Sequence, residues 1–166
     1  AAMASFDPKA TAQKDCIPVG VPNLMLYAVA DTITVQRDRV VMKVDWMDSE
    51  RTIFLDGRKH PPASETFLHG HSVGHWEGNT LVADTTNFKE HPLGLSTAGL
   101  PGSTKKHVTE RFSLGEGGKV LLYSGVVEDP VYLTRPVEWS GKWQYRPGMP
   151  HSNQKCDLTV AHKYLG

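Results

Sequence analysis

The chain contains 166 residues, of which 18 are Lys or Arg and 18 are Asp or Glu, so its formal net charge is zero when histidine is neutral. A balanced charge provides no electrostatic attraction for nucleic acid, and we expect no nucleic-acid partner. The longest apolar runs are far shorter than the roughly 20 residues of a membrane-spanning helix, so we also expect no membrane insertion.

Residues 1–23 are predicted to form an extended arm on the surface, because they contain Pro8, Pro18 and Pro22 and show no sustained hydrophobic period. The remaining residues, 24–166, have the length of a single domain. The start of the chain lacks the basic and apolar regions of a signal peptide, although the opening Ala-Ala-Met-Ala is typical of a processed end. We therefore expect no signal peptide in this chain, and an export signal that has been removed remains an alternative.

From residue 24 onward the pattern predicts a meander of short antiparallel strands. Each segment is rich in β-branched and aromatic residues and is bounded by Asp, Arg, Ser or Gly. Ile33 and Val35 alternate with polar residues, which is typical of a sheet with one solvent-exposed face. The predicted strands are 24–28, 32–36, 40–44, 52–55, 72–76, 80–86, 107–113, 119–127, 132–134, 137–145 and 157–164.

The strand pattern predicts an all-β fold, since no stretch keeps a 3.6-residue apolar period for the length of a helix. Closing one antiparallel sheet on itself removes its edges, which favours a small lipocalin-like β-barrel with room for one small ligand. A two-layer β-sandwich is the alternative. The long connection 87–105 is predicted to be a loop, either a lid over a pocket or a surface excursion.

A histidine cluster accompanies the central predicted hairpin, in which Gly78 and Asn79 suit a tight turn. His71, His75 and Glu77 would share one face of an extended strand, because strand side chains alternate. Two imidazoles and a carboxylate could bind Zn²⁺ or another transition metal. The polar outer face of a hairpin has the same pattern, so we expect no cofactor and keep a divalent transition metal as the alternative.

The strand face that points away from these histidines carries Trp76. If Trp76 packs inside the barrel, His71 and His75 face solvent. If the chain bends inward before Ser72, then His69 or His71 enters the mouth of the barrel. A one-residue slip of register exchanges His75 for Trp76 at the pocket, so the pattern leaves both arrangements open.

Asp84 and His107 are candidates for acid–base chemistry. Asp84 stands in the middle of a predicted strand, which favours a partly buried carboxylate, and Arg111 is its predicted counter-ion. This carboxylate is either part of a structural ion pair or a pocket group that orients a histidine. His107 shares a strand face with Arg111, opposite to Glu110, and is either a general base or a structural histidine.

A polar rim is expected after the strand 52–55, where Asp56, Arg58 and His60 alternate, although a solvated turn has the same composition. Tryptophan and other aromatic side chains could line a site for a ring-shaped ligand or pack in the core. No Gly-x-Ser-x-Gly elbow, phosphate-binding loop or dinucleotide fingerprint is present in the sequence. These absences argue against serine-hydrolase, nucleotide and NAD chemistry.

Cys16 and Cys156 lie near opposite ends of the chain. A disulfide between them would close almost the whole molecule and add roughly 4 to 5 kcal/mol by the loop-entropy argument. It would also imply an oxidising compartment. Two unrelated buried thiols are the alternative.

Three segments resemble the ordered signatures of a widespread bacterial family of mostly exported proteins. They are Arg51-Thr52-Ile53-Phe54-Leu55-Asp56-Gly57-Arg58-Lys59-His60-Pro61, Gly74-His75-Trp76-Glu77-Gly78-Asn79-Thr80-Leu81-Val82-Ala83-Asp84-Thr85 and His107-Val108-Thr109-Glu110-Arg111-Phe112. The family core is similar to Trp-Glu-Gly-Asp-Thr-Leu-Val-Val-Asp-Thr, from which Asn79 and Ala83 depart, and the resemblance runs from about Asp7 to the C-terminus. It implies a periplasmic or secreted protein with paired cysteines and implies no particular activity. Position 75 is often Arg in that family, which argues against His75 as an obligatory metal ligand.

These patterns predict a cofactor-independent lyase, isomerase or hydrolase that acts on a small cyclic or aromatic molecule in a barrel pocket. The candidate catalytic residues are His71, Asp84, His107 and Glu110, with either histidine as base and either carboxylate orienting it. The candidate substrate-binding residues are Arg58, His60, Trp76, Arg111 and Tyr132. The alternatives are a noncatalytic periplasmic barrel that binds a small ligand between tryptophans, and a metal-dependent site at His69, His71 and His75.

Overall fold

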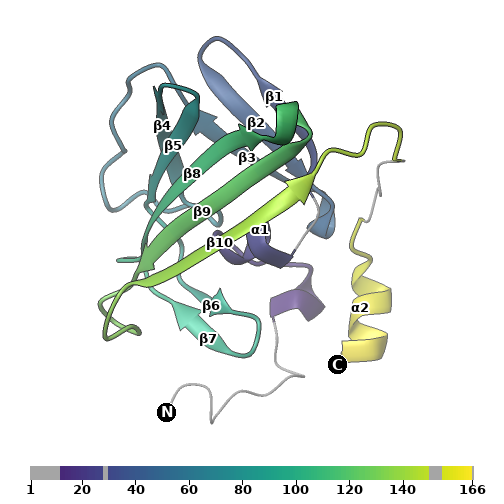
Figure 1. Ribbon diagram of the computed structural model, residues 1–166. Coiled ribbons are helices and arrows are strands. Elements are labelled where there is room, and N and C mark those ends of the chain that lie inside the picture. Colours follow the sequence, from purple (N-terminus) through teal and green to yellow (C-terminus); the bar gives the residue numbers. More distant parts are fainter. Residues whose placement is uncertain (1–11, 28–29, 150–154, 166) are drawn as a thin grey trace.

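The computed structural model describes residues 12–27, 30–149 and 155–165 (Figure 1). The 3₁₀ helices are η3 (Ala12–Asp15), η4 (Trp46–Asp48) and η5 (Glu116–Gly118), and the α-helices are α1 (Asn23–Tyr27) and α2 (Leu158–Leu165). The strands are β1 (Ala30–Val35), β2 (Arg39–Val44), β3 (Ser49–Phe54), β4 (His71–Glu77), β5 (Thr80–Thr86), β6 (His91–Ser96), β7 (Leu100–Gly102), β8 (His107–Gly115), β9 (Val120–Glu128) and β10 (Val137–Gln144). The prediction of an all-β protein is confirmed.

Eight strands form one curled sheet in the order β1-β2-β3-β4-β5-β8-β9-β10. Neighbouring strands are antiparallel except β3 and β4, which run parallel and pair only through Ile53 with Ser72 and Phe54 with Val73. Among the described strands, β1 and β10 stay at opposite edges, so the sheet is an open half-barrel (Figure 1). The closed lipocalin-like barrel and the uninterrupted antiparallel meander are therefore wrong.

The concave side of the sheet is filled by the N-terminal part of the chain and α1 (Figure 1). Val19, Val21 and Leu24 are completely buried there and pack with sheet residues such as Ile53 and Tyr123. This packing occupies the interior that a closed barrel would keep for a ligand. Residues 19–22 of the predicted surface arm are thus buried, whereas Asp15 and Ile17 are exposed, and residues 1–11 of the predicted arm lie outside the described residues.

Two predicted strands are helices. Residues 24–27 belong to α1, which starts directly after Pro22 as helices commonly do, and residue 28 of that predicted strand is outside the described residues. Residues 158–164 belong to α2, whose first turn is capped by Asp157: its Oδ1 accepts hydrogen bonds from the backbone N–H groups of Thr159 at 2.8 Å and Val160 at 3.2 Å.

Two connections also differ from the prediction. Residues 132–134 form a turn in which the backbone N–H groups of Tyr132 and Leu133 donate to the carbonyl of Asp129, so no strand is present there. The predicted loop 87–105 contains the β6–β7 hairpin. In this hairpin Gly94 approaches Gly102 so closely that a Cβ on Gly94 would lie 2.7 Å from the facing backbone.

Cys16 and Cys156 form a disulfide with a Cα–Cα distance of 5.6 Å, which joins the chain after η3 to the segment before α2. His162 Nε2 of α2 lies 3.1 Å from Asp15 Oδ1 of η3. The two ends of the described chain are therefore held together, and the predicted disulfide is confirmed. None of the described helices is both long and apolar enough to cross a membrane.

Candidate functional site

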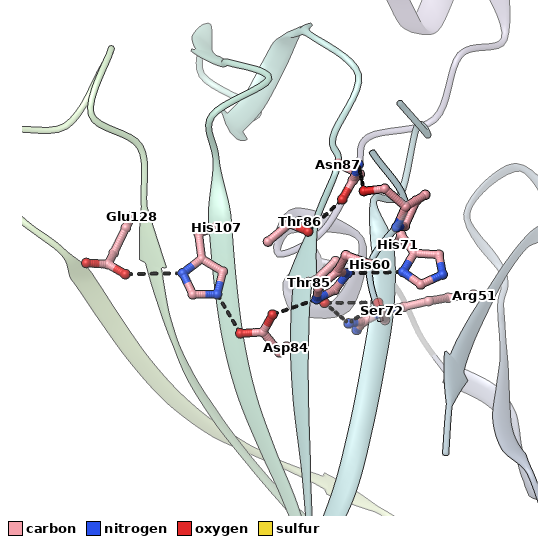
Figure 2. Close-up of polar contacts among 11 residues, drawn as sticks. Arg51, His60, His71, Ser72, Asp84, Thr85, Thr86, Asn87, His107 and Glu128 are labelled. Carbon is pink, nitrogen blue, oxygen red and sulfur yellow. Dashed lines mark hydrogen bonds and ion pairs between the residues drawn. The ribbon is translucent and has the colours of Figure 1, made fainter. Parts of the chain in front are cut away.

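Asp84, on β5, lies between two histidines that come from distant parts of the chain (Figure 2). Its Oδ2 is 2.6 Å from Nε2 of His107 on β8, and its Oδ1 is 2.8 Å from Nε2 of His60 in the loop after β3. The Nδ1 atoms of His60 and His71 are 3.0 Å apart, and His107 Nδ1 is 3.4 Å from Glu128 Oε2. We call the continuous row Glu128–His107–Asp84–His60–His71 the histidine relay.

Sheet register explains why the relay forms on one face. Asp84 is paired with Val73 of β4 and with Thr109 of β8. Because side chains alternate along a strand, His71 and His107 project from the same face as Asp84. His60 is the exception, since it reaches this face from a loop.

The relay shifts the pKa of three of its members. The hydrogen bond from His107 lowers the pKa of Asp84, and the same bond raises the pKa of His107 above its ordinary value of 6.5. Burial, followed by the charge of His60, lowers the pKa of His71 below 6.5. Near neutral pH we therefore expect an ionised Asp84 and a neutral His71.

The proton positions in the relay follow from the donors and acceptors. An ionised Asp84 can only accept, so Nε2 of His60 must donate to it. A neutral imidazole has a single N–H, so the Nδ1 of a neutral His60 accepts from Nδ1–H of His71. Nε2 of His71 is then left with a free lone pair. It points away from His60 (Figure 2) and has no hydrogen-bond partner among the described residues.

Asn87 holds the loop that carries His60. It adopts a φ of 57°, a left-handed conformation that Asn tolerates better than most residues. Its Nδ2 donates to the carbonyls of Pro61, Pro62 and Glu65 at 3.2, 3.0 and 2.9 Å. These contacts fix the segment that follows His60 directly beside the end of β5.

A groove of about 470 Å³ opens next to His71, where β3 and β4 diverge from their short parallel contact. Phe54, Phe67 and His71 form its aromatic part: the ring centroid of His71 is 5.3 Å from that of Phe54, in a stacked arrangement, and 6.0 Å from that of Phe67. Arg58 Cζ lies over the Phe54 ring, 3.7 Å from its centroid, and Nε and Nη2 of Arg58 donate hydrogen bonds to the carboxylate of Asp56. The groove thus combines a planar apolar surface, a cationic edge and a basic imidazole nitrogen.

Gly70 allows the chain to turn between two groove residues, His69 and His71. Its φ is 73°, and a Cβ at this position would lie 2.7 Å from side-chain atoms of both Phe88 and Thr85. Only glycine satisfies the backbone conformation and the close approach together. The turn therefore depends on this residue.

Glu110, predicted as a catalytic carboxylate, lies on the opposite face of β8 from His107 and is completely buried. It pairs with the guanidinium of Arg51, whose Nη1 donates to Oε1 at 3.0 Å, and it accepts a hydrogen bond from Tyr123 at 2.7 Å. Arg51 Nη2 also donates to Thr85 Oγ1 at 3.1 Å. Glu110 therefore belongs to an internal ion pair and is separated from the relay by the sheet.

Other predicted residues lie apart from the groove. Arg111 donates to Glu77 Oε2 at 2.6 Å, so the prediction that it is the counter-ion of Asp84 is wrong. Trp76, at the end of β4, is 50% exposed. Tyr132, in the β9–β10 connection, donates to Glu90 Oε1 at 3.4 Å.

The structure does not bring His69, His71 and His75 together. His71 contacts His60, whereas His75 lies 3.2 Å from Glu77 near the exposed end of β4. Across residues 12–27, 30–149 and 155–165, no three His, Cys, Asp or Glu side chains are placed to hold one metal ion. The described residues thus do not form the metal site considered from the sequence.

Sequence reasoning missed Phe54, Phe67, Asn87 and Glu128. The two phenylalanines have no distinguishing pattern, because a core residue and a groove residue look alike in sequence. Asn87 does carry a signal, since an Asn directly after a strand suits a left-handed turn. Glu128 ends a strand that pairs with the strand of His107, and only the register reveals their contact.

Comparison of the chain with protein-family models, with curated proteins and with solved structures gave no match.

Proposed function

We propose that the protein is a cofactor-independent acid–base enzyme in which His71 removes a proton from a small molecule bound in the groove. One observation carries this proposal: His71 is hydrogen-bonded at Nδ1 by a histidine that is itself held by an ionised Asp84, while Nε2 is left without a partner among the described residues. A base that is oriented in this way by a second group is the usual arrangement in general acid–base catalysis.

The relay supplies a place for the proton. When Nε2 of His71 accepts a proton, the ring becomes an imidazolium that still donates from Nδ1 to His60. Transfer of that second proton to His60 moves the positive charge next to Asp84, whose negative charge stabilises it. Positioned general bases of this kind contribute about 10²- to 10⁴-fold to a rate. The proton then returns to the substrate at the same or another atom, or a leaving group departs, which are isomerase and lyase outcomes.

The groove favours a small cyclic or aromatic substrate. Phe67, which is 42% exposed, offers flat apolar surface on which flat ligands stack, whereas the Phe54 ring is already contacted by His71 and Arg58. Arg58 provides a positive charge at the edge, reduced by its ion pair with Asp56. The tryptophan-walled binding site considered from the sequence has less support, because Trp46, Trp139 and Trp143 pack against the core.

We also propose that the protein is periplasmic or secreted. The disulfide between Cys16 and Cys156 supports this, because such bonds persist mainly in oxidising compartments.

The function is tested by following proton exchange. A panel of small cyclic and aromatic carbonyl compounds is incubated with the protein in deuterium oxide, and loss of carbon-bound protons is followed by NMR. We expect His71→Gln to abolish exchange, because Gln cannot act as a base. His75→Gln is the matched control, since His75 lies on the same strand and outside the groove, and it should leave exchange unchanged.

The outcome that contradicts an enzyme is equally specific. If the wild-type protein binds members of the panel and exchanges none of their protons, and if His71→Gln binds them equally well, the groove is a noncatalytic ligand site.

A further inference from the structure

His69 lines the same groove as His71 and is not used by the relay. Neither ring nitrogen of His69 has a hydrogen-bond partner among the described residues, and Nδ1 is the one that is fully enclosed. Nε2 is therefore the nitrogen that a ligand in the groove can reach. A polar ring kept largely buried without a partner costs free energy unless something binds to it.

The proton of a neutral His69 is expected on Nε2. A buried N–H without an acceptor is rarer in proteins than a buried acceptor without a donor. Placing the proton on Nε2 leaves the enclosed Nδ1 as an acceptor and directs the N–H into the groove. Burial, together with the charges of Arg51 and Lys106, lowers the pKa of His69 to about 4, so the ring is neutral at physiological pH.

The surroundings of His69 also favour negative charge on a bound atom. The charges of the buried Arg51 and Lys106 act on this ring, but Glu110 offsets that of Arg51, and burial lowers the pKa of Lys106 to about 7, so that Lys106 carries only part of its charge near neutral pH. Lys106 is fixed by donating to the carbonyls of Val21 at 2.7 Å and Gly94 at 2.9 Å. A fixed donor in a positive field is the arrangement that stabilises a developing oxyanion.

We infer that Nε2–H of His69 donates a hydrogen bond to the carbonyl oxygen of the substrate, and that the substrate class is small carbonyl compounds with a proton on the neighbouring carbon. This inference rests on the proposed function of His71 and names the partner residue and the substrate chemistry.

The proposed step converts the bound carbonyl compound to an enolate. The C–H bond next to the carbonyl breaks and its proton goes to Nε2 of His71. The electron pair of that bond forms the carbon–carbon double bond of an enolate, and the carbonyl π electrons move to the oxygen. His69 stabilises this oxygen. Return of the proton to a carbon restores a carbonyl compound, so no oxidant or reductant is consumed.

The oxyanion site is tested with para-nitrophenol, whose phenolate is planar, carries its charge on oxygen and absorbs differently from the phenol. We expect the bound probe to ionise at lower pH than the free probe. His69→Phe should abolish this shift. His75→Phe is the matched control, because it replaces an imidazole by a phenyl ring outside the groove, and it should keep the shift.

Proton exchange gives the second readout. Loss of one oxyanion donor typically lowers a rate by about 10²- to 10³-fold, and we expect His69→Phe to lower exchange by this amount. His69→Gln, which retains an N–H donor, should retain more exchange than His69→Phe. If His69→Phe folds poorly, His69→Gln still tests whether an N–H donor at this position supports exchange.

The outcomes separate the two proposals. A shifted probe without exchange in the wild-type protein supports the oxyanion site and contradicts the enzyme. Exchange that depends on His71 and is unchanged in His69→Phe supports the enzyme and overturns the inference about His69. A wild-type protein that does not bind the probe, or an equal probe shift in His69→Phe, also overturns it.

Discussion

The Nδ1 atoms of His60 and His71 lie 3.0 Å apart, so these two rings share a single proton between them. Either ring can hold that proton, and its position determines the state of Nε2 of His71. Nε2 has a free lone pair when Nδ1 of His71 donates to His60, and it carries a proton when Nδ1 of His71 accepts. The pair can therefore work as a base and as the acid that returns the proton.

His107 and His71 should titrate on opposite sides of 6.5, with His107 above and His71 below this value. Because the hydrogen bond with Asp84 is the main cause of the raised pKa of His107, Asp84→Asn should lower that pKa. Proton–carbon NMR of the imidazole rings measures both values, and exposed His75 serves as an internal control. An unchanged His107 titration in the variant would show that the bond to Asp84 is absent in solution.

The same shift links stability to pH. A raised pKa in the folded state means that His107 contributes stability that is complete below pH 6.5 and is lost as pH rises through the folded-state pKa. The side chains of His107 and Asp84 are 36% and 42% exposed, so solvent screening keeps this contribution below about 1 kcal/mol. Urea unfolding of the wild-type protein and Asp84→Asn at a series of pH values measures it.

Proton exchange in the groove should decline toward acid pH with a midpoint below 6.5. The reason is that His71 must be neutral to act as a base, and burial together with His60 lowers its pKa. The pH dependence of kcat/KM on an exchanging compound measures this midpoint. A midpoint above 6.5 would assign the base to His107 instead.

Asn87→Asp should release the loop that carries His60. The replacement keeps the size of the side chain but removes the donor that binds three carbonyls and turns a carboxylate toward them. Loss of these bonds at a buried position is expected to cost about 1 to 3 kcal/mol. Urea unfolding measures the cost, and the His60 and His71 resonances report whether the relay is lost.

Asn87→Gly is the control for this variant, because glycine accepts the positive φ and lacks the amide. It should also lose the relay. If its histidine resonances match those of the wild-type protein, the loop is held by other contacts.

Removing one member of the internal ion pair should destabilise the fold strongly. Glu110→Leu leaves Arg51 buried without a carboxylate, and breaking a buried pair in this way costs about 3 to 5 kcal/mol. The double variant Arg51→Met with Glu110→Leu should recover much of the loss, since no charge is left unpaired. Equal stabilities of the single and double variants in urea unfolding would contradict this account.

The central hairpin shows how much of this fold is local information. The predicted strands 72–76 and 80–86 match β4 and β5 closely, because the alternation and the Gly78-Asn79 turn are contained within the segment itself. The sequence does not predict α1, since five residues are too few to show a helical period. In α2, Leu158 and Val160 alternate as in a strand and obscure the capping signal of Asp157.

In the candidate site too, the sequence predicts what is local and misses what depends on contacts between distant segments. Asp84, His60, His71 and His107 stand out individually by residue type, but their grouping depends on non-local pairing. The register of β5 with β8 brings His107 beside Asp84 and takes Arg111 toward Glu77. The closed barrel fails as a prediction because edge removal is a general preference, and here buried residues such as Val19 and Leu24 fill the curl instead.

The short parallel contact between β3 and β4 divides the sheet into two hydrogen-bonded blocks, β1–β3 and β4–β10 without the separate β6–β7 hairpin. Arg51 crosses this boundary, because it starts on β3 and reaches Ser72, Thr85 and Glu110 on β4, β5 and β8. Since the groove lies on the same boundary, a bound molecule would touch both blocks at once. Ligand binding and cooperative unfolding would then be coupled. The ligand would bridge the two blocks and oppose their separation, and the ligand-free protein would unfold first at the contact between β3 and β4.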